Sequence, residues 1–169
     1  FIGFKTGGIW TLNISSGVER WEEIPINCGV CTLMKDRYQD IIWIASDGKG
    51  VYAYSDDEYS ISSTFSSDIS KLLGRPVRCM QLEKGDLWIG YKGDGIVKID
   101  DYTPLTDLRH AHFTHFTASD SRLTDNRVFA FEPGDNDILW IGHHEGLNYY
   151  AYRTRTIERL PFMCNGEPI

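Results

Sequence analysis

A tandem repeat constrains this chain more than any other feature. An aromatic residue, an apolar residue and a small residue occur in succession four times, starting at Phe1, Trp43, Trp88 and Trp140. The aromatic residues recur at intervals of about 40 to 50 residues, a period typical of repeat architectures. A unit of this size cannot bury its own apolar faces, so we expect successive units to stack against one another.

Each complete unit predicts four short antiparallel strands, which we name A to D in chain order, with the aromatic residue in strand B. Strand A begins at a valine in three units: Val30, Val77 and Val128. A turn glycine separates strand B from strand C in all four: Gly8, Gly50, Gly95 and Gly146. Glycine takes positive φ without steric cost, so a glycine between two alternating runs indicates a hairpin.

The pattern predicts an all-β fold, because the only helical periodicity is a single turn over 68–74. Four-stranded units of this length are typical of a β-propeller, here a fragment of about three and a half blades. We place a partial blade 1 over 1–26, blade 2 over 27–70, blade 3 over 71–118, blade 4 over 119–163 and a tail over 164–169.

The three tryptophans of strand B are expected to form the structural core between blades: Trp43, Trp88 and Trp140. Burial of ~150 to 250 Å² per ring is worth at most roughly 4 to 6 kcal/mol each. A small residue, Cys79, takes the same place in its unit as Thr32 and Ala130, so we also expect it inside.

Charge and hydropathy exclude two partner classes. The formal net charge is −7 and the acids are scattered, whereas a nucleic-acid binder shows a basic stripe. No apolar run reaches the ~20 residues of a membrane helix, and no signal peptide is present. Phe1 already belongs to a repeat, so we expect the chain to be a piece of a longer protein whose other blades complete it.

Two stretches carry a family resemblance: "LTDNRVFAFEPGDNDILWIGHHEGLNYY" from Leu123 and "VRCMQLEKGDLWIGYKGDGIVKID" from Val77. They resemble the two-component regulator propeller repeat, whose pattern joins Leu-Ser/Thr-Asp/Ser-Asn to Leu-Trp-Ile-Gly-Thr and Gly-Leu. Phe1 for tryptophan and Ala45-Ser46 for Gly-Thr depart from it. The resemblance covers nearly the whole chain. It implies a periplasmic (extracytoplasmic) ligand-sensing domain of a hybrid two-component sensor histidine kinase that responds to a saccharide.

Catalysis is not expected of this chain. The acids lie mostly in turns, where aspartate serves the backbone, and neither Gly-x-Ser-x-Gly nor His-Glu-x-x-His occurs. A glycosidase needs two carboxylates placed across a sugar, and no such pair stands out. We therefore expect no enzyme activity, no cofactor and no metal.

The cysteines and histidines leave alternatives open. Cys28 and Cys31 have the spacing of a redox motif, but no second cysteine pair completes a zinc site. Three states of these two cysteines stay open: free thiols, a disulfide or a bound metal. Cys164 lies in the tail. In the run from His110, His112 shares a face with His110 and His115 points away, which favours a solvated strand over a metal site.

A ligand is expected on the rim formed by the B–C turns and the D–A connections, because loops on a rigid scaffold carry binding sites. The candidates are Lys92, Asp94, His143, His144, Glu145, Arg75, Arg78, Arg122 and Arg127. Their cations suit the carboxylates or sulfates of an acidic oligosaccharide.

A scaffold propeller that grips another protein, or a second copy of itself, is the alternative function. An aromatic patch on one rim would favour it. Incomplete end blades would leave apolar surface uncovered, so the isolated chain is expected to self-associate as an open arc, unless the tail supplies the missing strand A.

Overall fold

A computed structural model describes residues 1–22, 28–38, 41–48, 50–55, 60–62, 75–102, 111–160, 163–164 and 167–168. Every regular element in them is a strand, and neighbouring strands pair antiparallel. None of these residues forms a helix long and apolar enough to cross a membrane. The single turn expected over 68–74 lies outside the described residues.

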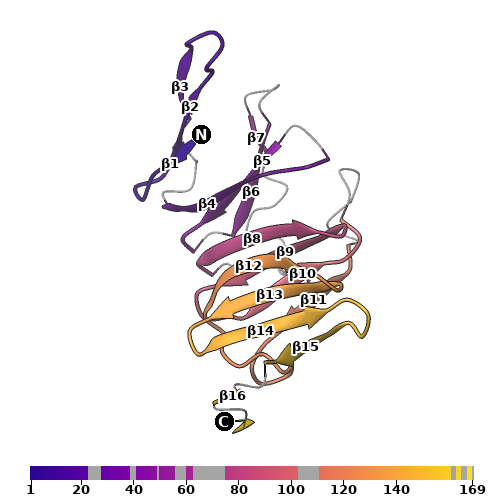
Figure 1. Ribbon diagram of the computed structural model, residues 1–169. Helices are drawn as coiled ribbons and strands as arrows, with labels where there is room; N and C mark the ends of the chain where they lie inside the picture. The colour runs from indigo at the N-terminus through magenta and orange to yellow at the C-terminus, as the bar shows by residue number, and fades with distance from the viewer. Residues whose placement is uncertain are drawn as a thin grey trace.

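The strands form four sheets that follow the predicted blades in chain order (Figure 1). Blade 1 has three strands: β1 (Ile2–Gly3), β2 (Ile9–Leu12) and β3 (Glu19–Glu22). Blade 2 has β4 (Val30–Lys35), β5 (Ile41–Ser46), β6 (Val51–Ser55) and β7 (Ser60–Ser62). Blade 3 has β8 (Val77–Glu83), β9 (Asp86–Tyr91), β10 (Ile96–Ile99) and β11 (Phe113–Phe116). Blade 4 has β12 (Val128–Gly134), β13 (Ile138–His143), β14 (Gly146–Ala151) and β15 (Thr156–Arg159).

The tail forms a two-stranded sheet of its own. β16 (Met163–Cys164) pairs with β17 (Glu167–Pro168), and within the described residues neither strand joins blade 1.

The turn glycines behave as the hairpin signal predicts. Their φ angles are positive at every B–C turn: 88° at Gly8, 82° at Gly50, 75° at Gly95 and 127° at Gly146. At Gly95 an added Cβ would lie 2.1 Å from the carbonyl oxygen of Phe116, so both the turn and the neighbouring strand require glycine there.

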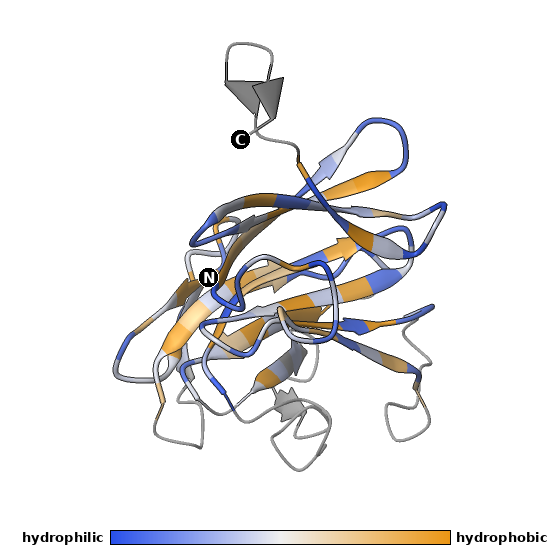
Figure 2. Cartoon of the chain, turned by 90° about the horizontal axis from the view of Figure 1, so that it is seen from below, coloured by the Kyte–Doolittle hydropathy of each residue, from blue (hydrophilic) through white to orange (hydrophobic). Residues whose placement is uncertain are grey.

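The pairing register confirms that the repeats are structurally equivalent. Trp88 on strand B lies opposite Gln81 on strand A and Lys98 on strand C. In blade 4, Trp140 takes the same position. Figure 2 shows hydrophobic residues mainly along the strands, where they alternate with polar ones, and hydrophilic residues frequent in the turns.

The core lies between the sheets, not within them. Trp43 packs with β8 to β10 of blade 3, and Trp88 packs with Leu139 and Ile141 of blade 4. Trp43 and Trp88 are fully buried. Trp140 was predicted to be part of the core between blades, but its side chain is only half-buried. No described sheet covers its face, and its ring meets Tyr149 of its own blade at 5.8 Å.

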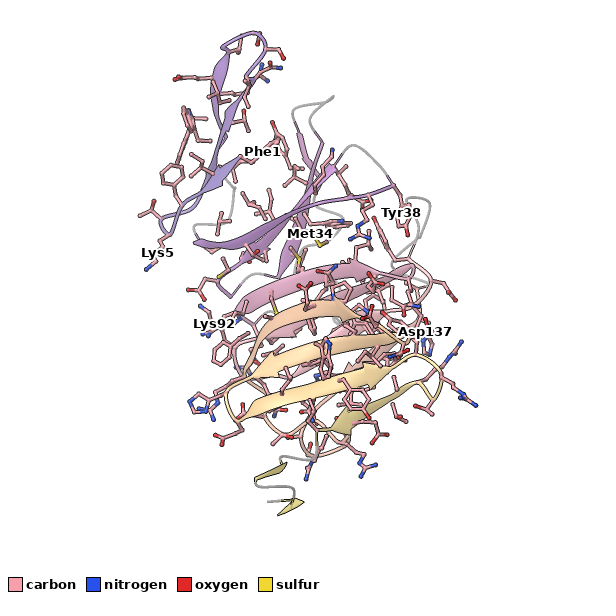
Figure 3. All side chains as sticks on the ribbon, in the orientation of Figure 1. Phe1, Lys5, Met34, Tyr38, Lys92 and Asp137 are labelled. Carbon is pink, nitrogen blue, oxygen red and sulfur yellow. The ribbon has the colours of Figure 1, made fainter. Side chains whose placement is uncertain are left out.

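The two ends of the strands form the two rims. Backbone hydrogen bonds confirm that the B–C turns share a rim with the D–A connections: Asp47 to Gly29, Lys92 to Pro76 and His144 to Arg127. The A–B turns lie at the other rim. Lys92 of a B–C turn and Asp137 of an A–B turn therefore sit at opposite ends of the strands (Figure 3).

Candidate functional site

Acids engage two of the blade 3 cations on the predicted rim. Lys92 pairs with Asp47 of blade 2 at 2.8 Å, and Arg75 lies 3.7 Å from Asp94. On the same rim, Arg122 bonds Glu158 at 2.8 Å. These pairs leave little uncompensated positive charge for an acidic ligand.

The B–C turn of blade 4 and the D–A connection before it together hold a group of possible metal ligands. One ligand atom each of Asp125, His144 and Glu145 lie within 4.8 Å of one another. Arg127 already bonds this group, at 2.5 Å to Asp125 and 3.4 Å to Glu145. Hydrogen bonds from the Arg127 side chain lower the pKa of Asp125 to about 2. The guanidinium thus provides the positive charge that a cation would otherwise bring.

His143 was predicted to lie on the exposed rim, but its side chain is buried, with 5% of its surface exposed. The alternation of strand β13 continues through Leu139 and Ile141 to His143, so all three face blade 3. Its Nδ1 accepts a hydrogen bond from the backbone nitrogen of Glu145 at 3.2 Å. Burial lowers the pKa of His143, which favours the neutral ring.

Strand A carries a bulge at the same place in blades 2, 3 and 4. The register shifts between Val30 and Thr32, between Val77 and Cys79, and between Val128 and Ala130. The bulged residues are Cys31, Arg78 and Phe129. The Arg78 guanidinium lies 4.3 Å from the Phe129 ring centre, so the bulges bring side chains of adjacent blades together.

Several cysteines and histidines have defined neighbours in the structure. Within the described part of the chain, Cys28, Cys31 and Cys79 form no disulfide. Burial raises the pKa of Cys79 to about 12 and also raises the pKa of Cys31, which disfavours the thiolates. His112 bonds Asp100, and His115 contacts the backbone oxygen of Asp94. His110 lies outside the described residues.

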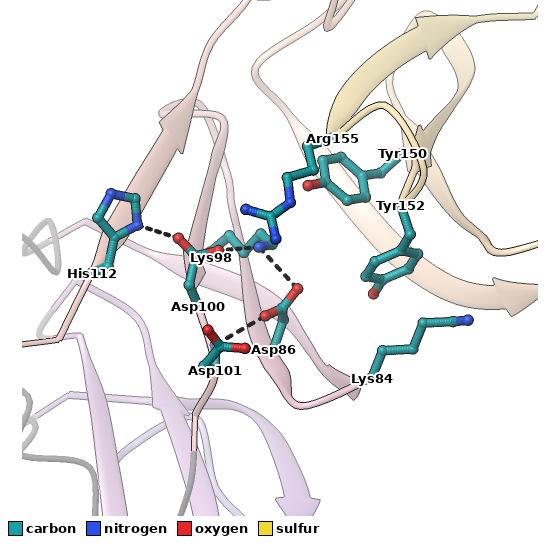
Figure 4. Close-up of a pocket in the computed structure, with 9 residues that line it drawn as sticks. All are labelled: Lys84, Asp86, Lys98, Asp100, Asp101, His112, Tyr150, Tyr152 and Arg155. Carbon is teal, nitrogen blue, oxygen red and sulfur yellow. Dashed lines mark hydrogen bonds and ion pairs between the residues drawn. The ribbon is translucent and has the colours of Figure 1, made fainter.

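A pocket of about 450 Å³ lies at the opposite rim, at the junction of blades 3 and 4 (Figure 4). Blade 3 contributes charged side chains from its A–B turn, its strands and its C–D turn: Lys84, Asp86, Lys98, Asp100, Asp101 and His112. Blade 4 contributes Tyr150, Tyr152 and Arg155. A pocket of this volume at the junction of two structural units is typical of small-molecule sites.

Lys98 is the central charge of this pocket. Its side chain is 8% exposed, and its ammonium lies 2.9 Å from Asp86 and also bonds Asp100. The same ammonium lies 5.6 Å from the ring centre of Trp88 and 5.7 Å from that of Tyr150. Burial alone would lower the pKa of Lys98, but the hydrogen bonds to the two aspartates outweigh it and raise the pKa.

The two aspartates are in turn fixed by blade 3. Asp86 accepts a hydrogen bond from the backbone nitrogen of Asp101 at 3.1 Å, which links the C–D turn to the start of strand B. Asp100 also bonds His112 and accepts from the Thr114 hydroxyl at 3.3 Å. Burial would raise the pKa of Asp100, yet the bonds from Lys98 and His112 lower it overall.

Three polar groups of the pocket remain open. The Tyr150 hydroxyl, the Asp101 carboxylate and the Arg155 guanidinium make no hydrogen bond or ion pair within the described part of the chain. Arg155 and Tyr150 point toward Lys98 (Figure 4). Together they offer donors and acceptors to a bound molecule.

The sequence prediction missed this pocket, although one signal was present. Lys98 stands in strand C between Val97 and Ile99, directly opposite Trp88. A lysine paired with a core tryptophan is necessarily close to the blade junction, and it needs acidic partners there.

Comparison with known structures identifies the fold. The chain matches the extracellular domain of BT4673 from B. thetaiotaomicron, which is named as a one-component system, at a TM-score of 0.68 and 15% identity over 93% of this chain and 23% of that one. The fold is that of a β-propeller. The propeller domain of Cps50 (Swd1) from Myceliophteria thermophila matches at a TM-score of 0.58 and 10% identity, over 89% of this chain and 52% of that one.

A second extracellular domain has a similar fold. The extracellular domain of BT3049 from B. thetaiotaomicron, named as a hybrid two-component system, matches at a TM-score of 0.62 and 20% identity, over 94% of this chain and 24% of that one. The chain thus spans about a quarter of the length of these extracellular domains. No family model and no curated protein matches the chain.

Proposed function

We propose that this propeller segment is part of the non-catalytic ligand-sensing domain of a two-component sensor, outside the cytoplasm, and that its ligand is a saccharide. The pocket at the junction of blades 3 and 4 carries the proposal, because donors and acceptors converge there beside two tyrosines. Sugar hydroxyls both donate and accept hydrogen bonds, so they can use both kinds of group. The fold shared with the extracellular domains of BT4673 and BT3049 supports the location.

The state of the pocket carboxylates favours binding over catalysis. Asp86 and Asp100 both bond Lys98, and the pKa of Asp100 is lowered by Lys98 and His112 against the effect of burial. A general acid of a glycosidase needs a raised pKa. Asp100 is therefore held deprotonated, so it fixes the pocket wall and does not donate a proton to a substrate.

Calorimetric titration of the 169-residue chain with oligosaccharides from polysaccharide digests tests the proposal. Saturable binding is expected, and chromatography should recover each oligosaccharide unchanged. Release of new reducing ends would contradict the non-catalytic assignment. Absence of binding across the digests would contradict saccharide sensing.

Exposed apolar side chains on blade 1 favour a second candidate, the protein-interaction scaffold. They are Phe1, Ile2, Phe4, Leu12, Ile14, Val18 and Trp21. Ile14 is 91% exposed, and a pocket of about 540 Å³ lies among these residues. Exposed apolar patches mark interaction sites. Self-association in sedimentation that is lost in an Ile14→Ser, Trp21→Ser double variant would support this function, whereas a monomeric parent chain would count against self-pairing.

A further inference from the structure

The charges that line the pocket between blades 3 and 4 are balanced. Three cations (Lys84, Lys98 and Arg155) face three carboxylates (Asp86, Asp100 and Asp101). His112 is the remaining titratable base, and it bonds Asp100. A lining of this kind exerts no net attraction on an anion or a cation, so recognition depends on the groups that are still open.

Most of these charges are already used inside the protein. Lys98 bonds both Asp86 and Asp100, and Lys84 pairs with Asp137 outside the pocket. An ammonium has three donors, so Lys98 retains one beyond its two aspartate bonds. Removing Lys98 would leave the largely buried carboxylates of Asp86 and Asp100 uncompensated, whereas the pair of Lys84 and Asp137 is exposed.

The open groups have mixed character. Arg155 offers donors only, Asp101 offers acceptors only, and the Tyr150 hydroxyl offers both. Arg155 and Tyr150 come from blade 4, whereas Asp101 comes from the C–D turn of blade 3. A molecule that satisfies all three must carry donors and acceptors at several points and must bridge the two blades.

We propose that this pocket binds a neutral saccharide unit and discriminates against acidic sugars. This inference rests on the proposed function, and it names the class of ligand that the site takes. Neutral hydroxyl groups donate to Asp101 and accept from Arg155 and Lys98. A uronate or sulfate group can pair with the Arg155 guanidinium. It is also repelled by the carboxylate of Asp101 and by that of nearby Asp86, because all of these groups are negative. Acids engage Lys92 and Arg127 on the other rim, and Arg78 there stacks on Phe129, far from this pocket.

The test uses ¹H–¹⁵N NMR titration of the 169-residue chain with maltotriose, cellotriose, xylotriose and mannotriose as neutral probes. Trigalacturonate is the acidic probe of matched size. At least one neutral trisaccharide is expected to shift the amides around Tyr150 and Asp101, and trigalacturonate is expected to bind about tenfold more weakly or not at all.

Two variants locate the site. Asp101→Asn and Arg155→Gln are each expected to weaken binding of the neutral trisaccharide about tenfold or more, because each removes a charged hydrogen-bond partner. Asp101→Asn should also improve binding of trigalacturonate. Lys92→Gln, on the other rim, is the matched control and should change neither. Thermal unfolding shows whether each variant remains folded.

The outcomes separate this inference from the proposed function. Binding of trigalacturonate alone would overturn the inference and leave saccharide sensing standing. Neutral binding that is unchanged in both folded pocket variants would overturn the assignment of the site. Binding of no probe, neutral or acidic, would overturn the inference together with saccharide sensing.

Discussion

The ring of Trp43 in blade 2 meets the ring of Tyr102 in blade 3 edge-on, with centroids 5.6 Å apart. Asp36 joins them: its Oδ2 accepts from Trp43 Nε1 at 2.8 Å and from the Tyr102 hydroxyl at 3.2 Å. The junction therefore combines ring packing with a buried polar contact that satisfies the indole donor.

Aromatic contacts also lie at the other two junctions. The Trp88 ring lies 6.3 Å from Tyr152 of blade 4, and its Nε1 donates to the Tyr152 hydroxyl at 3.2 Å. Phe1 of blade 1 lies 6.0 Å from Tyr54 of blade 2. An aromatic residue of strand B thus meets a tyrosine in or just after strand C of the next blade.

Replacement of the buried tryptophan tests the weight of this contact. Trp88→Ala is expected to destabilise the chain by ~3 to 5 kcal/mol, because a fully buried ring leaves a cavity. The half-buried Trp140 is the matched control, and Trp140→Ala should cost less than half as much. Urea unfolding monitored by circular dichroism measures both. Equal costs would contradict the assignment of the core to the junctions.

Removal of the pocket ammonium tests its structural role. Lys98→Met is expected to cost about 3 kcal/mol, since Asp86 and Asp100 lose the charge that compensates them. Lys92→Met removes an exposed pair with Asp47 and should cost at most about 1 kcal/mol. If chemical denaturation gives the same value for both variants, Lys98 does not hold the pocket together.

Two equivalent glycines should respond differently to the same substitution. At Gly90 an added Cβ would lie 2.5 Å from Cys79 Sγ and 2.8 Å from a methyl group of Val128 in blade 4. Gly90→Ala is therefore expected to cost about 1 to 3 kcal/mol through overpacking. Gly142 occupies the same repeat position, but its nearest neighbour is Ala130 Cβ at 3.8 Å. Gly142→Ala should stay within about 0.5 kcal/mol, and a larger loss would show that its face is not open.

The acid side of the stability profile should include Asp125. Its pKa lies at about 2 because the Arg127 side chain and backbone donate to its carboxylate. A depressed pKa stabilises the fold above the unfolded value of about 4, and this contribution is lost as pH falls through about 2. NMR titration of the side-chain carboxyl should give this midpoint, and Arg127→Ala should move it upward. An unchanged midpoint in the variant would refute the pairing.

Much of the fold could be predicted from the sequence because strands and turns are coded locally. Alternation and the turn glycines place the strands, and the Trp88 repeat position places strand B at the centre of each blade. The burial of Trp140 could not be predicted in the same way. Its strand is identical in pattern to β9, but burial depends on whether another sheet covers that face.

The complete pocket could not be predicted from the sequence for a similar reason, although Lys98 was one signal of it. Lys98 and Tyr152 are far apart in the chain and meet only because blade 4 packs on blade 3. From its residue type alone, a lysine or an aspartate is predicted to lie on the surface. The rim prediction had the opposite fault, because it treated Arg127 and Lys92 as open cations when nearby acids already bind them.

Each aromatic contact joins two consecutive blades, so one sequence repeat does not contain a whole contact. Each repeat supplies the strand B aromatic residue that contacts the following blade and the tyrosine, in or just after strand C, that contacts the preceding blade. A genetic duplication of one whole period, wherever its breakpoints fall, therefore copies one of each and leaves every junction matched. A gene built on this rule can lengthen or shorten by whole blades without redesigning an interface.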